Sequence, residues 1–460
     1  MSGNGSAGLL LLLIIEKARN MKIKSFLVCG LLVAGVSVAS AQSAYDALNF
    51  SHNDLALGTA RYSAMAGAMG AFGGDASTLR DNPAGLGVYR SCDLNFTPNL
   101  YLDNDNSLGI NVNNFGVVLN FGKKGNKSGY ITSSLGIGYD RLKNFSRTTN
   151  EDVYVDGEPY DYTTYKEDGG IGEWNFSYGL NISNRLYLGL GFGVASLDYE
   201  GTTLYEEAVA DGHYLDDRLD VSGTGWNFKI GAIVRATDFM RVGLAFHTPT
   251  YYNGVKEYED VIQSTDVIGD ELWDAYERSY DFQTPLKLQG SLGFVIGKHA
   301  LLGIEYNYQD YKAMKVDGRY VGAGASRDYD RVFDDEMEAS HTIKVGAEVM
   351  VAKNVAVRAG FAHVTEPIRD LSEGDVELKE IPYSIALPKQ TNYITVGAGY
   401  KGRVFYCDLA YVHKIKKEHY YGVSYWELDE DKMPIYNIPT SPSEVTGHNN
   451  NITLTFGWRF

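Results

Sequence analysis

Apolar and polar side chains alternate one for one at the C-terminal end of the chain. In Asn451–Phe460 a large apolar residue falls on every even number, and Thr, Asn, Gly or Arg lies between. Successive side chains of a β-strand point to opposite faces, so this segment is predicted to be a strand with one apolar and one polar face. The same period recurs in earlier segments, at 115–121, 174–182, 226–235, 302–309 and 343–349.

The connections between the predicted strands are of two kinds, short and long, which alternate along the chain. After the third strand, tight turns such as Asn184 and Lys401-Gly402 alternate with long, acidic, tyrosine-rich connections. Transmembrane barrels have an even number of strands, short periplasmic turns and long outer loops. We therefore predict an all-β fold, a 14-stranded antiparallel transmembrane β-barrel. The predicted strands are 88–101, 108–122, 129–143, 172–183, 185–199, 222–236, 240–253, 282–297, 300–314, 339–352, 354–365, 389–400, 403–416 and 447–460, and the predicted long loops are 144–171, 200–221, 254–281, 315–338, 366–388 and 417–446.

Aromatic residues near the strand ends favour a membrane barrel over a soluble sandwich. Trp174, Trp226 and Trp458 are examples, and girdles of aromatic residues mark the two membrane interfaces of such barrels. A soluble sandwich would turn its apolar face into a core and would need no aromatic ends. The terminal Phe460 is similar to the signal through which bacterial outer-membrane barrels engage the barrel assembly machinery.

A secretory leader precedes the predicted barrel. Met21 is followed by two lysines, then by the apolar run 26–38, and then by Ala39-Ser40-Ala41. This order of basic, apolar and small residues is typical of a signal peptide, so we expect the true start at Met21 and cleavage after Ala41. We therefore assign 1–41 to the signal peptide region and predict the bacterial outer membrane as the location. The net charge of −17 excludes nucleic acid as a partner, since no basic stripe could meet phosphates.

The stretch 57–89 fits neither the strand period nor the helix period. Gly, Ala, Ser and Met predominate in it, and Asn82-Pro83-Ala84-Gly85 near its end has a turn composition. A segment with so few large apolar groups cannot build a core, but its small residues allow close packing inside another structure. We interpret 42–87 as an N-terminal hatch that plugs the lumen of a barrel formed by 88–460.

This stretch resembles the hatch of FadL-type outer-membrane transporters of long-chain fatty acids and other hydrophobic compounds. The likeness is carried by Ala60-Arg61-Tyr62-Ser63, the glycines around Gly70, the run Gly74-Asp75-Ala76-Ser77, and Asn82-Pro83-Ala84. The form of the motif is similar to a branch often labelled haemin receptor. The resemblance implies passive uptake of a hydrophobic ligand, with capture among the outer loops, hatch movement and lateral exit beside a kinked third strand.

Two sets of site residues follow from this interpretation. The hatch and gating set is Arg61, Asp75, Asn82, Pro83 and Ala84, and we expect its charges, with those of Arg80 and Asp81, to pair with charged residues facing the lumen. Gly136 and Gly138, inward residues of the third strand, are the lateral-exit candidates. Small residues at these two positions could equally make room for the hatch, and both readings stay open. The ligand-binding residues are unknown from the sequence.

No catalytic motif, cofactor site or metal site stands out, and we do not expect an enzyme. Three alternative functions remain: a haem-uptake barrel in which His413 and His419 contact the haem, a plugged porin for polar solutes, and an adhesin that uses the long loops. The expected partners are a hydrophobic small molecule, outer-membrane lipid and lipopolysaccharide, and the assembly machinery. We expect a monomer.

Overall fold

The structure is a computed structural model of the full chain. It describes residues 47–51, 55–102, 108–122, 129–155, 158–207, 214–265, 270–318, 333–335, 337–368, 385–421, 424–428, 434–437 and 443–460. The predicted signal peptide lies outside these residues. Residues 47–51 are helical, and the other named helical elements are α2 (Ala60–Ala64), α3 (Thr78–Asp81), η1 (Pro83–Val88) and η2 (Tyr311–Ala313). Among the described residues, no helix is long and apolar enough to cross a membrane.

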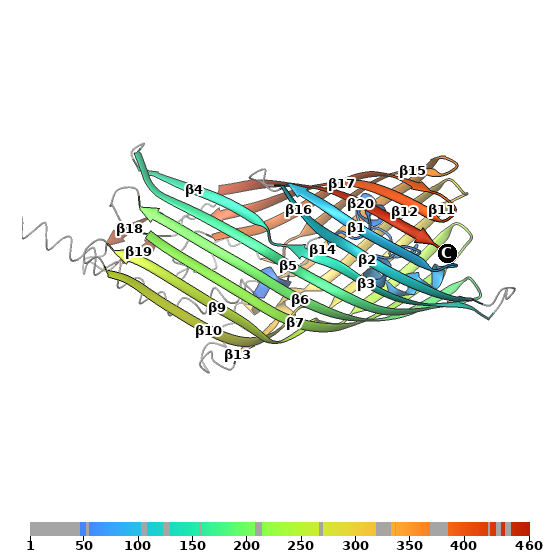
Figure 1. The fold of residues 1–460 in the computed structure, drawn as a ribbon, viewed down its shortest axis with the longest axis horizontal. Coiled ribbons are helices and arrows are strands. Elements are labelled where there is room, and N and C mark those ends of the chain that lie inside the picture. Colours follow the sequence, from blue (N-terminus) through green and yellow to red (C-terminus); the bar gives the residue numbers. More distant parts are fainter. Residues whose placement is uncertain are drawn as a thin grey trace, which may run out of the picture.

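The described strands form one closed antiparallel barrel of fourteen spans, which confirms the predicted fold class (Figure 1). The barrel closes where β1 pairs with both β2 and β20. The strands are β1 (Asp93–Leu102), β2 (Leu108–Gly122), β3 (Tyr130–Asn144), β4 (Arg147–Val155), β5 (Glu158–Ile182), β6 (Leu186–Glu207), β7 (Tyr214–Arg235), β8 (Met240–His247), β9 (Tyr251–Thr265), β10 (Asp270–Gln283), β11 (Lys287–Ile296), β12 (Ala300–Asp310), β13 (Lys315–Gly318), β14 (Ala339–Ala352), β15 (Val355–Thr365), β16 (Ile385–Lys401), β17 (Phe405–Tyr421), β18 (Ser424–Leu428), β19 (Pro434–Asn437) and β20 (Ser443–Arg459).

Several spans are made of two strands in series. β8 continues into β9 across Pro249, and β10 continues into β11 across Pro285. Proline has no N–H to give to a β-ladder, so it interrupts the strand at these points. β12 continues into β13 through η2, and β3 is followed by β4, which pairs with the outer half of β5. β18 and β19 form a separate two-stranded sheet.

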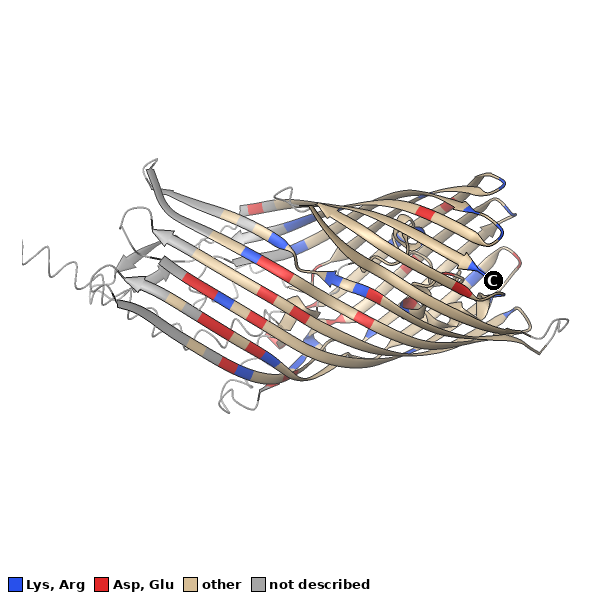
Figure 2. Ribbon diagram, in the orientation of Figure 1, with Lys and Arg blue, Asp and Glu red and all other residues tan. Residues whose placement is uncertain are grey.

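The barrel turns its apolar side chains outward and its polar side chains inward. Phe176 and Ile230, for example, are exposed on the outer face, whereas Asn175 and Lys229 on the same strands are buried in the lumen. This is the reverse of a soluble barrel and fits a lipid-facing surface. The charged residues gather on the outer parts of the strands and at the short turns, and the band between them carries few (Figure 2).

The predicted long loops were wrong in several places, because much of this sequence continues the strands. Most of 144–171, 200–221 and 254–281 belongs to β4 and β5, β6 and β7, and β9 and β10, which extend well beyond β1 and β2 (Figure 1). Beyond the membrane no lipid requires an apolar outer face, so the regular alternation that marks a membrane strand in the sequence is lost there. The predicted first strand, 88–101, also began too early, because Pro83–Val88 forms η1.

Candidate functional site: a segment inside the barrel and the chamber beside it

Residues 55–89, which we name the luminal segment, lie inside the barrel. The segment contains α2, α3 and η1, and large side chains such as Tyr62 and Met65 are fully buried. The η1 turn packs against β5, β6 and β7, and α2 packs against β16 and β17. The segment therefore touches the wall on opposite sides of the lumen, in the place where the sequence predicted a hatch.

Glycines on the inner face of the barrel wall allow the luminal segment to pack close to the strands. A Cβ at Gly189 of β6 would overlap the backbone of Pro83 and Ala84, and a Cβ at Gly303 of β12 would overlap the carbonyl of Ala68. These glycines belong to two rows of cross-strand pairs on the inner face, since neighbouring members are directly opposite in the ladders. The rows are Gly179, Gly189 and Gly231, and Gly293, Gly303, Gly346 and Gly360.

The Asn82-Pro83-Ala84 motif fixes the turn between α3 and η1. The Asn82 side-chain oxygen accepts from the Ala84 N–H at 3.2 Å, while its amide nitrogen donates to the Gly70 carbonyl at 2.8 Å. Pro83 is the first residue of η1, a position that needs no N–H donor. The motif thus joins two parts of the luminal segment, and its backbone at Pro83 and Ala84 packs against Gly189 of the first glycine row.

Arg61 ties the luminal segment to one side of the wall. Its guanidinium donates to both carboxylate oxygens of Glu348 at 2.8 and 3.0 Å, and Glu348 also accepts from Arg358 at 2.6 Å. Arg358 in turn donates to Asp408 at 2.6 Å. Burial would lower the pKa of Arg61, but the neighbouring Glu348 carboxylate outweighs it and raises that pKa above its usual value. The charge of Arg61 is therefore permanent.

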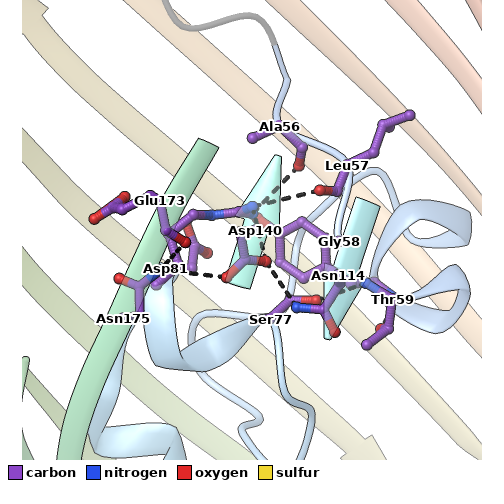
Figure 3. A network of polar contacts seen from close by, with 12 residues as sticks. Ala56, Leu57, Gly58, Thr59, Ser77, Asp81, Asn114, Asp140, Glu173 and Asn175 are labelled. Carbon is purple, nitrogen blue, oxygen red and sulfur yellow. Dashed lines mark hydrogen bonds and ion pairs between the residues drawn. The ribbon is translucent and has the colours of Figure 1, made fainter. Parts of the chain in front are cut away.

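Arg80 ties the segment to the opposite side, on β3. Its guanidinium lies 3.2 Å from Asp140, which also accepts from the Asn114 side chain of β2 at 2.9 Å (Figure 3). The same guanidinium donates to the carbonyls of Ala56 and Leu57 at 3.2 and 3.4 Å. Both charged side chains are almost fully buried, so removing either one would leave an uncompensated charge.

Asp81 makes a third attachment, to β11. Its carboxylate accepts from Lys287 at 3.4 Å and from Gln289 at 3.3 Å. Burial acts to raise the pKa of Asp81, but the ammonium groups of Lys344 and Lys287 together with Arg80 prevail and hold it well below its usual value. Asp81 is therefore ionised at every physiological pH.

Asp75 has a different role from the one the sequence suggested. The Asp75 carboxylate pairs with no cation of the wall in the described residues. It accepts hydrogen bonds from its own segment, from the Thr59 hydroxyl at 2.8 Å and the Ser77 N–H at 3.0 Å. These contacts connect the start of α2 with the start of α3. The Asp75 carboxylate thus shapes the luminal segment.

Gly136 and Gly138 lie opposite Leu79 of the luminal segment. A Cβ at Gly136 would come 2.6 Å from the Leu79 side chain, and the β2–β3 ladder runs unbroken past both glycines. The ladder of β3 with β5 shifts register on either side of these glycines, between Tyr130 and Thr132 and between Arg141 and Lys143. The β2–β3 ladder itself ends at Asn114 and Asp140, although both strands continue beyond these residues.

A cluster of packed, buried apolar side chains, which we name the apolar chamber, lies in the outer part of the lumen. Its wall includes Ile171 of β5, Leu197 of β6 and Val221 of β7, and the helix 47–51 packs into it. The Phe50 ring meets Phe145 and Tyr199 edge to face, with centroids 5.9 and 5.3 Å away. Part of the wall was missed from the sequence, because Ile171, Val221, Val255, Tyr280 and Val316 belong to strands that we had assigned to loops. The other buried members are Ala47, Leu48, Ala195, Tyr252, Val255, Tyr280, Phe282, Tyr311, Met314, Val316, Phe333 and Met337.

A polar layer separates this chamber from the luminal segment. Glu173 and Lys229 form a buried ion pair there, and Lys229 also donates to Asn175. Along the inner face of β5, Ile171 lines the chamber, Glu173 and Asn175 form the polar layer, and Ser177 donates to the Leu79 carbonyl at 2.9 Å. A molecule that leaves the chamber inward would therefore meet first the ion pair and then the luminal segment.

One of the two histidines considered for haem, His413, does not face the lumen. His413 faces outward from β17, where its ring nitrogen Nδ1 lies 2.8 Å from the Asn450 side-chain oxygen. The side chain of His419 lies outside the described part of the structure. In that described part, no group of three or more His, Cys, Asp and Glu side chains is placed to hold a metal ion.

Comparison with protein-family models finds no match, and neither does comparison with curated proteins. Solved structures do match. A "CymD monoaromatic hydrocarbon channel" superposes with a TM-score of 0.57 at 12% identity, over 89% of this chain and 99% of that one. A Pseudomonas aeruginosa FadL homologue gives 0.57 at 12% identity, over 87% and 98%. The Ralstonia pickettii toluene transporter TbuX gives 0.56 at 14% identity, over 88% and 99%.

This chain has the FadL-type barrel fold. The resemblance read from the sequence is confirmed at the level of the fold, and these identities show no more than the fold. The three structures are matched over 98–99% of their length. The structures matched are, by their names, channels and transporters.

Proposed function

We propose that this FadL-type barrel carries hydrophobic small molecules passively across the bacterial outer membrane and has no enzymatic activity. The observation that carries the proposal is the cluster of apolar side chains in the outer part of the lumen, which is bounded inward by the Glu173–Lys229 ion pair and, beyond it, by the luminal segment. A water-filled pore would have no use for so much apolar surface. The names of the matched structures, a monoaromatic hydrocarbon channel and a toluene transporter, support the same class of ligand.

The proposed path begins among the outer strand ends and leads into the chamber. A hydrophobic ligand gains about 0.8 kcal/mol for each CH₂ group that it removes from water. The helix 47–51 occupies part of the chamber, so a ligand must displace it or share the space. We propose that this displacement loosens the luminal segment, which acts as the hatch.

We place the lateral exit where the β2–β3 ladder ends, beyond Gly136 and Gly138. Asn114 and Asp140, the last pair of that ladder, also hold Arg80 of the luminal segment. Release of Arg80 would free both the hatch and the strand edges at one place. Exit there returns the ligand to hydrocarbon without passage through water.

A binding measurement tests the chamber directly. We expect purified protein in detergent to bind radiolabelled toluene or oleate in equilibrium dialysis, and Leu197→Glu to abolish binding because it places a carboxylate in the apolar wall. Leu190→Glu is the matched control, since Leu190 lies on the same strand but faces outward. Equal binding by the two variants would contradict the proposal, and the stronger ligand decides between hydrocarbon and fatty acid.

A strand-tethering experiment tests the exit. Asn113→Cys on β2 and Leu142→Cys on β3, whose native side chains both face the lumen, are joined by a bifunctional thiol reagent after removal of Cys92 and Cys407, and the tether should stop uptake until it is released. Leu100→Cys with Ile110→Cys is the control, because these residues are already opposite each other in the β1–β2 ladder. Undiminished uptake by the tethered β2–β3 protein would rule out this exit.

The remaining parts of the proposal concern processing and partners. We propose removal of 1–41 as a signal peptide, assembly through Phe460, and a monomer in contact with outer-membrane lipid and lipopolysaccharide. Heat-modifiable migration of the purified protein and its mass in detergent test assembly and oligomeric state. N-terminal sequencing tests the cleavage site after Ala41.

A further inference from the structure

A row of histidines lies on the outward face of five neighbouring strands, at the outer end of the apolar band. Three histidines lie just beyond the outward apolar residues of their own strands: His341 of β14, His363 of β15 and His413 of β17. The ladders pair His363 with Asn392 of β16 and His413 with Asn450 of β20. His341 and Asn392 are each displaced by two residues along their strands from the positions opposite His363 and His413, so the row is staggered at these two steps. We name these five residues the histidine row.

Each ring of the row is held in a fixed orientation through Nδ1. This atom lies 2.8 Å from the Asn392 oxygen in His363 and 2.8 Å from the Asn450 oxygen in His413. Because an amide oxygen only accepts, Nδ1 is the donor in both pairs. In His341, Nδ1 lies 2.7 Å from the Tyr306 hydroxyl. Within the described part of the chain, the three Nε2 atoms have no hydrogen-bond partner, so they remain available at the membrane boundary.

The rest of the same interface is built differently. On the other side of the barrel, the corresponding outward positions carry an ordinary aromatic girdle. Tyr139 of β3 is opposite Trp174 of β5, and Trp226 of β7 is opposite Tyr251 of β9. Aromatic rings of this kind anchor a barrel in any bilayer. The histidine row therefore marks one arc of the interface for a more specific contact.

Charge at the next outward level of this arc is mainly basic. Lys417 of β17 and Lys389 of β16 flank Glu444 of β20, at 2.5 and 3.7 Å. In the strand extensions on the other side, Arg218 is shared by Glu200 and Asp220, and Arg278 by Glu257 and Glu259, so each of these groups keeps an excess of negative charge. An anionic ligand at the outer membrane interface would therefore prefer the arc of the histidine row.

We propose that the histidine row binds the phosphate groups of lipopolysaccharide in the outer leaflet. An imidazole that donates through Nδ1 to an amide oxygen can take up a proton at Nε2 and donate there to a phosphate oxygen. A neighbouring phosphate favours that charged form. Lipopolysaccharide is the phosphorylated lipid of the leaflet that this end of the barrel meets. This inference depends on the membrane orientation of the barrel and is independent of the transported ligand.

The test compares lipid binding by two sets of variants. His341→Phe/His363→Phe/His413→Phe keeps the ring volume and removes the ring nitrogens, while Trp174→Phe/Trp226→Phe alters the opposite arc as the control. Purified proteins are titrated in detergent with bisphosphorylated lipid A, dephosphorylated lipid A and phosphatidylglycerol, and bound lipid is counted by native mass spectrometry. Heat-modifiable migration checks assembly, and the single variants His363→Phe and His413→Phe serve if the triple variant does not assemble.

We expect the wild-type barrel and the aromatic control to retain bisphosphorylated lipid A, and the triple variant to bind it on the order of tenfold more weakly, as for lost hydrogen bonds to a charged group. Each single variant should bind bisphosphorylated lipid A a few-fold more weakly than the wild type. Equal retention by the triple variant, or equal binding of dephosphorylated lipid A, would overturn the proposal. Phosphatidylglycerol binding as strong as that of lipid A would overturn the assignment to lipopolysaccharide.

Discussion

At the residue scale, the luminal segment is held by a few buried charges and by glycines. The sequence could identify Arg61 and Asn82-Pro83-Ala84, because a small-residue stretch with a turn motif is readable without knowledge of its surroundings. It could not identify the partners, since Glu348 and Asp140 come from strands far away in sequence. Asp75 shows the limit of such reasoning: its charge suggested a partner on the wall, whereas local N–H and O–H donors already satisfy it.

Arg80→Met should weaken the attachment of the luminal segment. It leaves Asp140 buried without its cation, which costs about 3–5 kcal/mol when a buried pair is broken. We expect frequent channel openings in planar bilayers, against few for the wild type. Arg235→Met is the control, because the Arg235–Asp238 pair is exposed at a short turn. A closed Arg80→Met barrel would show that this pair does not hold the segment.

Gly189→Val should displace the Asn82-Pro83-Ala84 turn. The added Cβ would overlap the backbone of the segment, and overpacking of this kind typically costs about 1–3 kcal/mol. Faster proteolysis of the luminal segment in the folded barrel is the expected result. Gly290→Val should leave it unchanged, since a Cβ at Gly290 meets open space. Equal protection of the two variants would show that the glycine row is not needed for close packing.

At the element scale, the membrane part of each strand was predictable and the outer part was not. Lipid on one face and polar groups on the other impose a two-residue period, which made strands such as β14 and β15 readable to within a few residues. The outer halves of β5, β6 and β7 lose that period and were taken for loops. Ile171 and Val221 of the chamber come from these halves, so this part of the proposed ligand-binding surface was not recognised in the sequence.

The helix 47–51 should compete with ligand for the chamber. Phe50→Ala removes the ring that packs on Phe145 and Tyr199, so it empties part of the space that a ligand would fill. We expect several-fold tighter binding of toluene in equilibrium dialysis. Weaker binding by Phe50→Ala would instead mean that Phe50 belongs to the ligand site.

The attachment of the luminal segment through Asp81 should resist mild acid. The folded-state pKa of Asp81 is lowered, so its stabilising contribution is fully present above the unfolded value of about 3.9 and is lost as the pH falls below it. The difference in channel conductance between the wild type and Asp81→Asn should stay constant from pH 8 to pH 5 and shrink only in stronger acid. Asp81→Asn should conduct more at neutral pH and lose part of this acid response. An opening near pH 6 that Asp81→Asn abolishes would contradict the assignment.

At the scale of the whole molecule, the parts form a sequence of compartments. Outer strand extensions enclose an apolar chamber, a buried ion pair closes it inward, and the luminal segment fills the barrel at the level of the membrane. The end of the β2–β3 ladder lies next to the Arg80 attachment. This order explains how a plugged barrel could pass an apolar molecule sideways while it stays closed to ions.

Uptake by cells tests the central claim most directly. Cells that depend on this barrel receive radiolabelled toluene or oleate, and their initial uptake rate is compared between Ala195→Trp, which fills the chamber, and Leu190→Trp, which changes the lipid face of the same strand. We predict about tenfold slower uptake for Ala195→Trp and an unchanged rate for Leu190→Trp. Equal rates for the two variants would contradict transport of hydrophobic molecules through the chamber.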